Sequence, residues 1–429
     1  MPVVCIKDGV HSLGGICITE TANVRNHIAP GETMVDVECA VVLAAGEGAR
    51  LRPLTRYRPK PMLPVANRPI IDYVLDSLLS TGIRNVVVVV GHQHTRIQDH
   101  LMQQYPEVEL TYVKQHHQLG SGDALVKTAG AVPDEFVVVN GDNVIDATMV
   151  GKTVENHQRN DACATVAVAR SDSAREYGTV CIENGRITTI LEQNGGDDQG
   201  RINVGVYVFE EPIFDALERT TVRSGELSLT DAIPYLPGEV APAVPDGVWY
   251  DPAYPWDLLD ISDQLHTAHP DLISGLENRS PVDETARVHE TAVVEDQVLV
   301  GPGCEISAGA VLRSGTCLRS DVRIGANSVI KRSLVGSGTT IGANASLRDS
   351  VIGEEVTIGE GTAAPGGPAD FVVDSRLHRD RQIGSLVSDR AEVGANVALS
   401  PGARIGPEAH VPHGNTVAGS LSVETGVVK

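Results

Sequence analysis

Short runs of β-branched residues alternate with longer amphipathic stretches through the first two thirds of the chain. Strands are predicted at residues 40–44, 85–90 and 136–139, and helices at residues 70–80, 95–104 and 148–159. Alternating strands and helices are typical of α/β domains. Ligands on such sheets bind where strands end at their carboxyl edge, so we expect functional residues directly after residues 44 and 139.

From about residue 267 onward the pattern changes to one aliphatic residue in every six. The spacing holds from Val288 to Ile330, is one residue short at Val335 and returns at residues 387–417. This period, with Gly or Asn at the corners, is the hexapeptide pattern of a parallel β-helix, whose triangular coils stack their inward residues on one another. The period stops between Gly361 and Ile383, where we expect a loop to leave the coil.

These patterns, with a length of 429 residues, indicate more than one domain. Residues 1–37 have no sustained period and a second Met at Met34, and we expect a poorly ordered extension there. The α/β domain is predicted at residues 38–266, a linker at 267–286 and the β-helix at 287–429, with its loop excursion at about residues 363–382.

The charge balance limits the partners of the protein. Lys and Arg number 34 against 56 Asp and Glu, giving a net charge of −22, so the surface should repel nucleic acid and anionic membranes. Only seven of the basic residues are Lys, and this acid-rich, Lys-poor composition resembles that of halophilic proteins from a high-salt cytoplasm.

Cysteine usage and hydropathy indicate the compartment. The seven Cys are scattered without CxxC spacing, which favours free thiols in a reducing compartment. No run reaches the roughly 18 apolar residues of a membrane span, and the N-terminus has no signal-peptide pattern. We expect a cytoplasmic protein.

A Gly-rich turn follows the first predicted strand. Gly46 and Gly48 would let backbone N–H groups approach a phosphate, although such a turn alone is more often a plain connection. Residues 50–55 then read Arg-Leu-Arg-Pro-Leu-Thr, and residues 59–65 read Pro-Lys-Pro-Met-Leu-Pro-Val. In a chain so poor in Lys, one fixed between two prolines is not a typical surface residue.

Residues 43–65 resemble the signature of sugar-1-phosphate nucleotidylyltransferases, a resemblance that covers about residues 38–265. It implies a Rossmann-like fold and transfer of a nucleotidyl group from UTP or dTTP to a sugar 1-phosphate. Bringing two polyanions together requires cations, backbone N–H groups and a divalent metal, here Mg²⁺. The sugar phosphate, with a second pKa near ~6, is already an ionised nucleophile. The resemblance assigns catalysis to Arg50 and Lys60, and nucleotide binding to Leu43, Ala44, Ala45, Gly46 and Gly48.

The resemblance assigns roles in four later motifs. Residues 115–124 resemble the base-reading loop of the uridylyltransferase branch, which implies that Gln115, Gly120 and Ser121 meet a pyrimidine. Sugar binding falls to Gly178, Glu192 and Asn203, and the metal ligands are Asp142 and Asp251. The sequence departs from the family where Gln193 replaces a usual Lys and Ala253 a usual Gly, which puts one phosphate contact and the geometry near Asp251 in doubt.

The fusion to a β-helix resembles archaeal and bacterial bifunctional GlmU-like enzymes, which also acetylate an amino sugar phosphate and carry a left-handed β-helix. Acetyl transfer needs a base, commonly a His. In the corresponding coil residues 341–346 read Ile-Gly-Ala-Asn-Ala-Ser, and Ala-Pro-Gly stands at residues 364–366 where an Asn is expected. His378, His410 and His413 are isolated and are read as solvated. We therefore expect the β-helix to assemble the protein as a homotrimer.

Three hypotheses remain open from the sequence. The first is a nucleotidylyltransferase, the second a bifunctional enzyme that also acetylates glucosamine 1-phosphate, and the third a non-catalytic regulatory or assembly subunit. The combination of Arg50, Lys60, Asp142 and Asp251 favours the first over the third. The sequence decides neither the sugar nor uracil against thymine.

Overall fold

The computed structural model describes residues 35–91, 93–160, 162–171, 177–191, 200–223, 225–274 and 280–422. Most of the predicted extension, and Glu192, lie outside the described residues. Residues 35–37 already belong to the fold, because the Val35 N–H donates to the Thr81 carbonyl over 3.1 Å and Val37 is buried.

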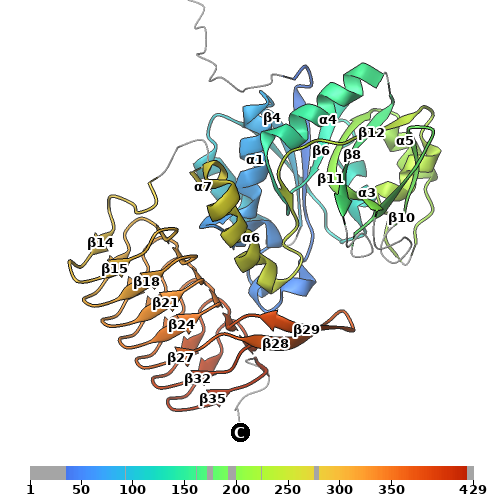
Figure 1. The fold of residues 1–429 in the computed structure, drawn as a ribbon. Helices are drawn as coiled ribbons and strands as arrows, with labels where there is room; N and C mark the ends of the chain where they lie inside the picture. Colours follow the sequence, from blue (N-terminus) through green and yellow to red (C-terminus); the bar gives the residue numbers. More distant parts are fainter. Residues whose placement is uncertain are drawn as a thin grey trace, which may run out of the picture. The chain divides into compact units, whose positions relative to one another are not determined.

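A nine-stranded mixed sheet forms the centre of the N-terminal domain (Figure 1). Its strands are β1 (Cys39–Ala44), β4 (Asn85–Val90), β5 (Glu109–Lys114), β6 (Glu135–Asn140), β8 (Ala164–Ser171), β9 (Thr179–Glu183), β10 (Arg186–Leu191), β11 (Gly200–Glu210) and β12 (Val240–Ala243). The main order is β10-β9-β11-β6-β1-β4-β5, with β8 between β11 and β12. The strands β6, β1, β4 and β5 run parallel, whereas β11 pairs antiparallel with β6.

Helices cover both faces of this sheet, which confirms the α/β fold. They are α1 (Ile70–Ser80), α2 (His94–Gln104), α3 (Ser121–Val126), α4 (Ala147–Asn160) and α5 (Ile213–Arg219), with the 3₁₀ segment η5 (Thr230–Tyr235). Alternate β1 residues face opposite sides, so Val42 packs with α1, α2 and α4, and Val41 with α3 and α5. The three predicted helices coincide with α1, α2 and α4 to within a residue at each end.

The strand order creates a crevice beside β1. After β1 the chain builds β4 and β5 on one side, and it then returns to place β6 on the other side of β1. At such a reversal the connections leave the carboxyl ends of two neighbouring strands in opposite directions, which opens a binding crevice between them. The segments that follow Ala44 and Asn140 therefore border the same opening.

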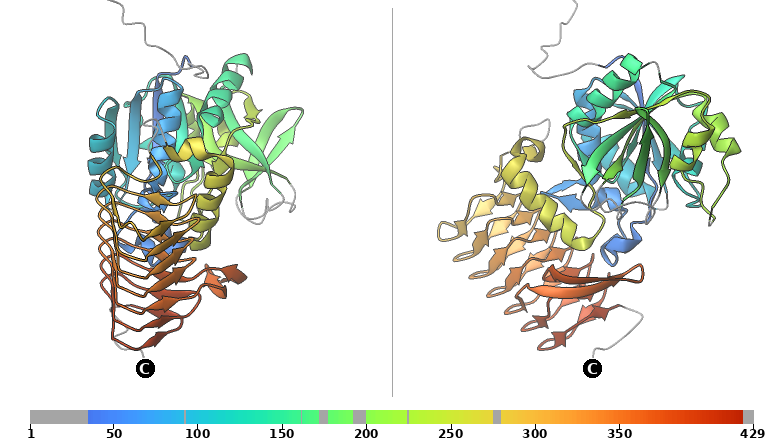
Figure 2. Two further views of the ribbon diagram at one scale, coloured as in Figure 1. Left: turned by 60° about the vertical axis from the view of Figure 1, so that its left-hand side comes forward. Right: turned by 45° about the vertical axis from the view of Figure 1, so that its right-hand side comes forward.

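The C-terminal domain contains three parallel seven-stranded sheets, which form the sides of a β-helix (Figure 2). The first is β14 (Arg287–Val288), β17 (Glu305–Ile306), β20 (Arg323–Ile324), β23 (Thr340–Ile341), β26 (Thr357–Ile358), β31 (Glu392–Val393) and β34 (His410–Val411). The second is β15 (Val293–Val294), β18 (Val311–Arg313), β21 (Val329–Lys331), β24 (Ser346–Arg348), β27 (Ala363–Ala364), β32 (Ala398–Leu399) and β35 (Thr416–Val417). The third is β16 (Leu299–Val300), β19 (Cys317–Leu318), β22 (Leu334–Val335), β25 (Val351–Ile352), β30 (Ser385–Val387), β33 (Ala403–Ile405) and β36 (Ser420–Leu421). This arrangement confirms the predicted β-helix and is consistent with its left-handed form.

The irregular period in the sequence has a structural cause. Val311 pairs with Val329, 18 positions on, whereas Val329 pairs with Ser346, 17 positions on. The missing residue falls at a corner, where Arg332 and, one coil later, Asp349 adopt positive φ angles of 46° and 52°. Arg332 binds Asp349 at this corner, together with Asp260 and Asp263 of the helix α6 (Pro255–Ala268). The shortened corners therefore lie against the N-terminal domain.

A β-hairpin stands where the loop excursion is expected. It consists of β28 (Pro368–Val373) and β29 (Arg376–Gln382), and Figure 1 shows it leaving the stack of coils. Val373 pairs with Arg376, so Asp374 and Ser375 form a two-residue turn with positive φ angles of 49° and 62°. Two positive φ angles are typical of the tight turns whose twist matches that of the paired strands.

An apolar cluster joins the β-helix to the N-terminal domain. The outward residues Cys317, Leu334, Val351 and Leu386 of the third sheet pack into one cluster with Leu51, Tyr73 and Trp256. The cluster also includes Phe371 of the hairpin, which is 1% exposed. Burial stabilises the fold by about 1.5–3 kcal/mol for each of these side chains, so the contact between the two domains is a hydrophobic core.

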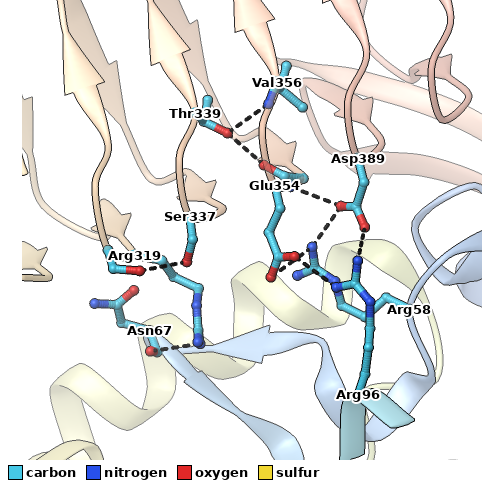
Figure 3. A network of polar contacts seen from close by, with 11 residues as sticks. Arg58, Asn67, Arg96, Arg319, Ser337, Thr339, Glu354, Val356 and Asp389 are labelled. Carbon is cyan, nitrogen blue, oxygen red and sulfur yellow. Dashed lines mark hydrogen bonds and ion pairs between the residues drawn. The ribbon is translucent and has the colours of Figure 1, made fainter. Parts of the chain in front are cut away.

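A network of charged side chains also joins the two domains (Figure 3). Arg58 donates to Asp389 over 2.7 Å with side chains only 4% and 6% exposed, and it lies 3.2 Å from Glu354. Arg96 of α2 binds Glu354 from the other side over 2.8 Å. Burial alone would raise the pKa of Glu354, but the charges of Arg58 and Arg96 lower it below its usual value. The β-helix is thus tied to residues that closely precede Lys60.

Shorter elements complete the fold. They are the 3₁₀ turns η1 (Ala49–Leu51), η2 (Leu54–Arg56) and η3 (Lys60–Met62), the strands β2 (Pro64–Val65), β3 (Arg68–Pro69), β7 (Val144–Ile145) and β13 (Trp249–Tyr250), and the helix α7 (Pro270–Ser274). Within the described part of the chain, no helix is both long enough and apolar enough to span a membrane. Five of the seven Cys lie in that part and are free thiols.

We predict that Arg58→Met destabilises the protein by about 3 kcal/mol, because it leaves the buried Asp389 carboxylate with only the more distant Arg96, at 3.9 Å. The measurement is the free energy of unfolding from urea titration at fixed salt. Arg56→Met is the matched control, since Arg56 is exposed in the same segment and should change stability by less than about 0.5 kcal/mol. Equal effects of the two substitutions would refute a stabilising role for the buried pair.

Candidate active site

The segment after β1 folds over the Lys60 side chain. Gly48 has a φ of +60°, and a Cβ at this position would lie 2.8 Å from the Lys60 Cβ, so only Gly fits here without displacing Lys60. Thr55 holds the turn by donating from its hydroxyl to the Gly48 carbonyl over 2.8 Å. The Gly-rich turn therefore packs directly against the Lys60 side chain.

Lys60 lies between two carboxylates. Its ammonium is 2.8 Å from Asp142 Oδ2 and 2.8 Å from Asp251 Oδ1. Burial would lower the pKa of Lys60, but the charges of Asp142 and Asp251 raise it above the ordinary value, so the side chain stays charged. Asp142 follows β6 and Asp251 follows β13, and the antiparallel pairing of β13 with β7 brings the two segments together.

Both carboxylates line a pocket of about 370 Å³. Its walls include Gly48, Arg50, Lys60, Asn140, Asp142, Tyr177, Gly178, Asn203, Trp249, Asp251 and Asp374. Two of the predicted sugar-binding residues are among them, and the third, Glu192, lies outside the described residues. The Asn203 amide is fixed in place, because it donates to the Tyr207 hydroxyl over 2.6 Å and accepts from the Gly205 N–H over 3.1 Å.

A second, larger cleft of about 860 Å³ adjoins the first. It is lined by Leu43, Ala44, Ala45, Gly46, Gln115, Gly120, Ser121 and Gln118, among others. Asn140 and Asp142 line both cavities, so the two form one continuous site. The site lies at the carboxyl ends of β1 and β6, where the strand order predicts a crevice.

Hydrogen bonds shape the wall formed by residues 115–121. The Gln115 side chain is 4% exposed and donates its amide hydrogens to the Gly120 carbonyl over 3.0 Å and to Asp123 over 2.8 Å. Ser121 accepts from the Leu229 N–H over 3.0 Å. Gly120 passes so close to Leu227 that a Cβ would lie 2.3 Å from its carbonyl oxygen. With both amide hydrogens donated, the carbonyl oxygen of Gln115 is the group that a ligand can meet.

Arg50 faces the hairpin. Its Nε lies 2.8 Å from Asp374 Oδ2, and its guanidinium carbon is 5.9 Å from the centre of the Tyr254 ring. The side chains of Arg50 and Asp374 are 34% and 59% exposed. The structure thus brings a residue of the β-helix domain into the pocket that holds Lys60, Asp142 and Asp251.

Several lining residues were not among the sequence predictions. Asn140 ends the apolar strand β6, and this polar residue at a strand end was a usable signal. Gln118 donates to the Ala45 carbonyl over 2.8 Å. Nothing in the sequence apart from its place in the motif of residues 115–124 indicated that it lines the site. His378, read as solvated, is in fact 7% exposed and packs 4.5 Å from the Tyr254 ring. Asp374 comes from a distant hairpin and could not be linked to Arg50 by sequence spacing.

The carboxylates of Asp142 and Asp251 fit a divalent cation, because both direct an oxygen at the same point. Among the described residues, no group of three or more His, Cys, Asp or Glu side chains could hold a metal ion. Two carboxylates are enough for Mg²⁺, which keeps several waters and takes further oxygens from phosphates. The donor set therefore suits a cation that arrives with a phosphorylated ligand.

Asp257 is a buried acid at the first turn of α6. Burial raises its pKa to about 7, with the charges of Asp251 and Asp260 adding to the effect and the Tyr254 N–H opposing it. The Asp257 carboxylate accepts from this N–H over 2.7 Å. Its proton is therefore retained at pH values where an exposed Asp is ionised.

Comparisons with known proteins show which families the two domains match. The family model "Nucleotidyl transferase" matches residues 39–268, and the model "GMPPB C-terminal domain" matches residues 276–366. A UTP–glucose-1-phosphate uridylyltransferase of Haloferax volcanii is 35% identical over 234 residues, which are 53% of this chain and 96% of that protein. The bifunctional protein GlmU of Methanocaldococcus jannaschii is 31% identical over 230 residues, 53% of this chain and 54% of that protein. The chain thus spans about half the length of the GlmU relatives it matches.

We predict that Asp257→Asn removes part of the pH dependence of stability. Between about pH 4, the usual pKa of Asp, and pH 7 the unfolded state has released a proton that folded Asp257 retains, so stability falls as the pH rises. The melting temperature of the wild type should therefore drop relative to Asp257→Asn between pH 5 and 8, by at least about 2 °C at fixed salt with EDTA. Asp271→Asn, at an exposed position of α7, is the control. Parallel pH profiles for all three proteins would contradict the prediction.

Proposed function

We propose, because the chain belongs to the nucleotidyl transferase family, that it joins a sugar 1-phosphate to the nucleotidyl group of UTP or dTTP and releases pyrophosphate. Enzymes of this family generally use a divalent metal, and we propose Mg²⁺. The uridylyltransferase relative from Haloferax volcanii supports a pyrimidine triphosphate and a hexose 1-phosphate as substrates.

One observation carries the proposal. The Lys60 ammonium lies 2.8 Å from each of Asp142 and Asp251, beside a Gly-rich turn and in the smaller of two connected cavities. A regulatory subunit that binds no triphosphate has no need of a buried cation and two converging carboxylates at this point. The larger cleft suits the nucleoside, and the smaller pocket, which contains Arg50 and Lys60, suits the phosphate groups and the sugar.

Each charged side chain has a place in the transfer. A metal bound by Asp142 and Asp251 would offset charge on the phosphates. Lys60, held beside these carboxylates, offsets negative charge that develops around the α-phosphorus, and Arg50 does so at the departing pyrophosphate. The backbone of Gly46 and Gly48 approaches the triphosphate closely. An oxygen of the sugar phosphate attacks in line with the leaving group, so no side-chain base is required.

The base contact follows from the hydrogen bonds of Gln115. Its amide hydrogens are held by Gly120 and Asp123, so its carbonyl oxygen accepts from the ring N–H of uracil or thymine. Ser121 and Gly120 form the rest of this wall. Gly178, Glu192 and Asn203 are proposed to bind the sugar, with Tyr177 and Trp249 forming an aromatic wall at a centroid distance of 5.4 Å.

The proposal includes the cellular environment and the assembly of the protein. The net charge of −22 supports work in a salt-rich cytoplasm, where an acidic surface keeps a protein soluble. We propose that the β-helix assembles the chain as a homotrimer and positions the catalytic segment. Acetyl transfer is not part of the proposal, because residues 341–346 carry no His to act as the base.

The test is pyrophosphate release across a grid of triphosphates and sugar 1-phosphates with Mg²⁺, at low and multimolar salt. We expect release with UTP or dTTP and at least one hexose 1-phosphate, dependent on both substrates. No release with any pair would overturn the proposal.

The same assay includes a matched pair of variants. Lys60→Ala should lower turnover by at least ~10²-fold, the cost of one charged contact in the transition state, with the fold intact by circular dichroism. Lys152→Ala, at an exposed position on α4, should match the wild type. Near-normal turnover of Lys60→Ala would remove Lys60 from the mechanism.

A further inference from the structure

The hairpin β28–β29 is anchored on the segment that follows Asp251. Phe371 meets the Trp256 ring edge-on at 5.2 Å, and His378 packs 4.5 Å from the Tyr254 ring and 5.2 Å from the Trp256 ring. The guanidinium carbon of Arg381, in β29, lies over the Trp256 ring at 5.2 Å from its centre. Because Phe371 and His378 are buried, the direction of the hairpin is set by packing.

This packing places the turn of the hairpin at the pocket around Lys60. Asp374 occupies the first position of the two-residue turn and places Oδ2 2.8 Å from Arg50 Nε. It also lines the pocket that contains Lys60, Asp142 and Asp251. The pocket thus contains two cationic side chains and three carboxylates from the described residues.

The three carboxylates are not equivalent when a polyphosphate enters. Asp142 and Asp251 converge on one point and can exchange the Lys60 ammonium for a metal ion, so their charge remains compensated. Asp374 pairs with Arg50, whereas Lys60 pairs with the other two carboxylates of the pocket. A phosphate that binds the Arg50 guanidinium therefore competes with Asp374 for the Nε–H and is repelled by the Asp374 carboxylate.

We propose that Asp374 is a displaceable counter-ion of Arg50, through which the β-helix domain weakens the binding of polyphosphate groups in the transferase site. This inference rests on the proposed function only for Arg50 as a phosphate-binding residue. The pair is partly exposed, and such pairs are weak, so a triphosphate can break it readily. We expect the charge of Asp374 to raise the KM for triphosphate and not to change kcat, because Asp374 separates from Arg50 when the triphosphate binds, before the transfer step.

The test compares Asp374→Asn with Asp380→Asn. Both substitutions remove one negative charge from the same hairpin, and both positions have positive φ, at 49° and 54°, which Asn tolerates well. Asp380 is exposed and lies outside the residues that line the pocket. The probe is inorganic tripolyphosphate, whose dissociation constant is measured by calorimetry at fixed Mg²⁺ and low salt, so that no turnover is needed.

For Asp374→Asn we expect the dissociation constant of tripolyphosphate to fall by ~3- to 10-fold, and the KM for the nucleoside triphosphate to fall with it while kcat stays within about twofold. Asp380→Asn should match the wild type. In an Arg50→Met background, Asp374→Asn should have no effect, because the cation that it competes for is gone.

Several results would overturn the inference. They are unchanged or weaker tripolyphosphate binding by Asp374→Asn, an equal gain from Asp380→Asn, a gain that persists with Arg50→Met, or a fall in kcat of ten-fold or more. If the pyrophosphate assay shows no transfer, the calorimetry still decides whether Asp374 competes for Arg50, so the two proposals fail separately.

Discussion

The ammonium of Lys60, shared by Asp142 and Asp251, is the interaction on which the site depends. It joins three segments that are far apart in the chain: the turn after β1, the end of β6 and the end of β13. Without this cation the two carboxylates would face each other in a partly buried pocket and repel. In the function proposed above, the same two carboxylates would hold a divalent cation, and Lys60 would then offset charge on a phosphate.

The β-helix contributes to this site as well as forming its own core. Its carboxylates pair with the segment of residues 50–60 at two points, Asp389 with Arg58 and Asp374 with Arg50. The first pair is buried and contributes to stability, whereas the second is partly exposed and can open. Between them, the apolar contact of the third sheet with Leu51 and Trp256 keeps the segment at a fixed distance from the coils. The domain that we propose as an assembly module therefore supports the pocket around Lys60.

The sequence predicted the parts of the fold that local periodicity determines. The alternation of strands and helices and the six-residue period correspond to real elements, because burial imposes these periods directly. The contact between the domains was not predicted, although a pattern in the sequence indicates it. In the third sheet, apolar residues precede the inward position, as in Cys317-Leu318, Leu334-Val335 and Val351-Ile352, and this second apolar face marks a surface that is covered. The link between Arg50 and Asp374 depends on the direction of a packed hairpin, which no local pattern encodes.

The most direct test of the central claim follows the oxygen atoms of the sugar phosphate. The enzyme is supplied with Mg²⁺, UTP and a hexose 1-phosphate whose phosphate carries a heavy oxygen isotope, and the products are examined by phosphorus NMR. Attack by the sugar phosphate on the α-phosphorus predicts that all the label stays bonded to the phosphorus next to the sugar. One labelled oxygen becomes the bridge to the uridylyl phosphorus, and the pyrophosphate is unlabelled. Label in the pyrophosphate, or release of labelled inorganic phosphate without a nucleotide sugar, would contradict the account.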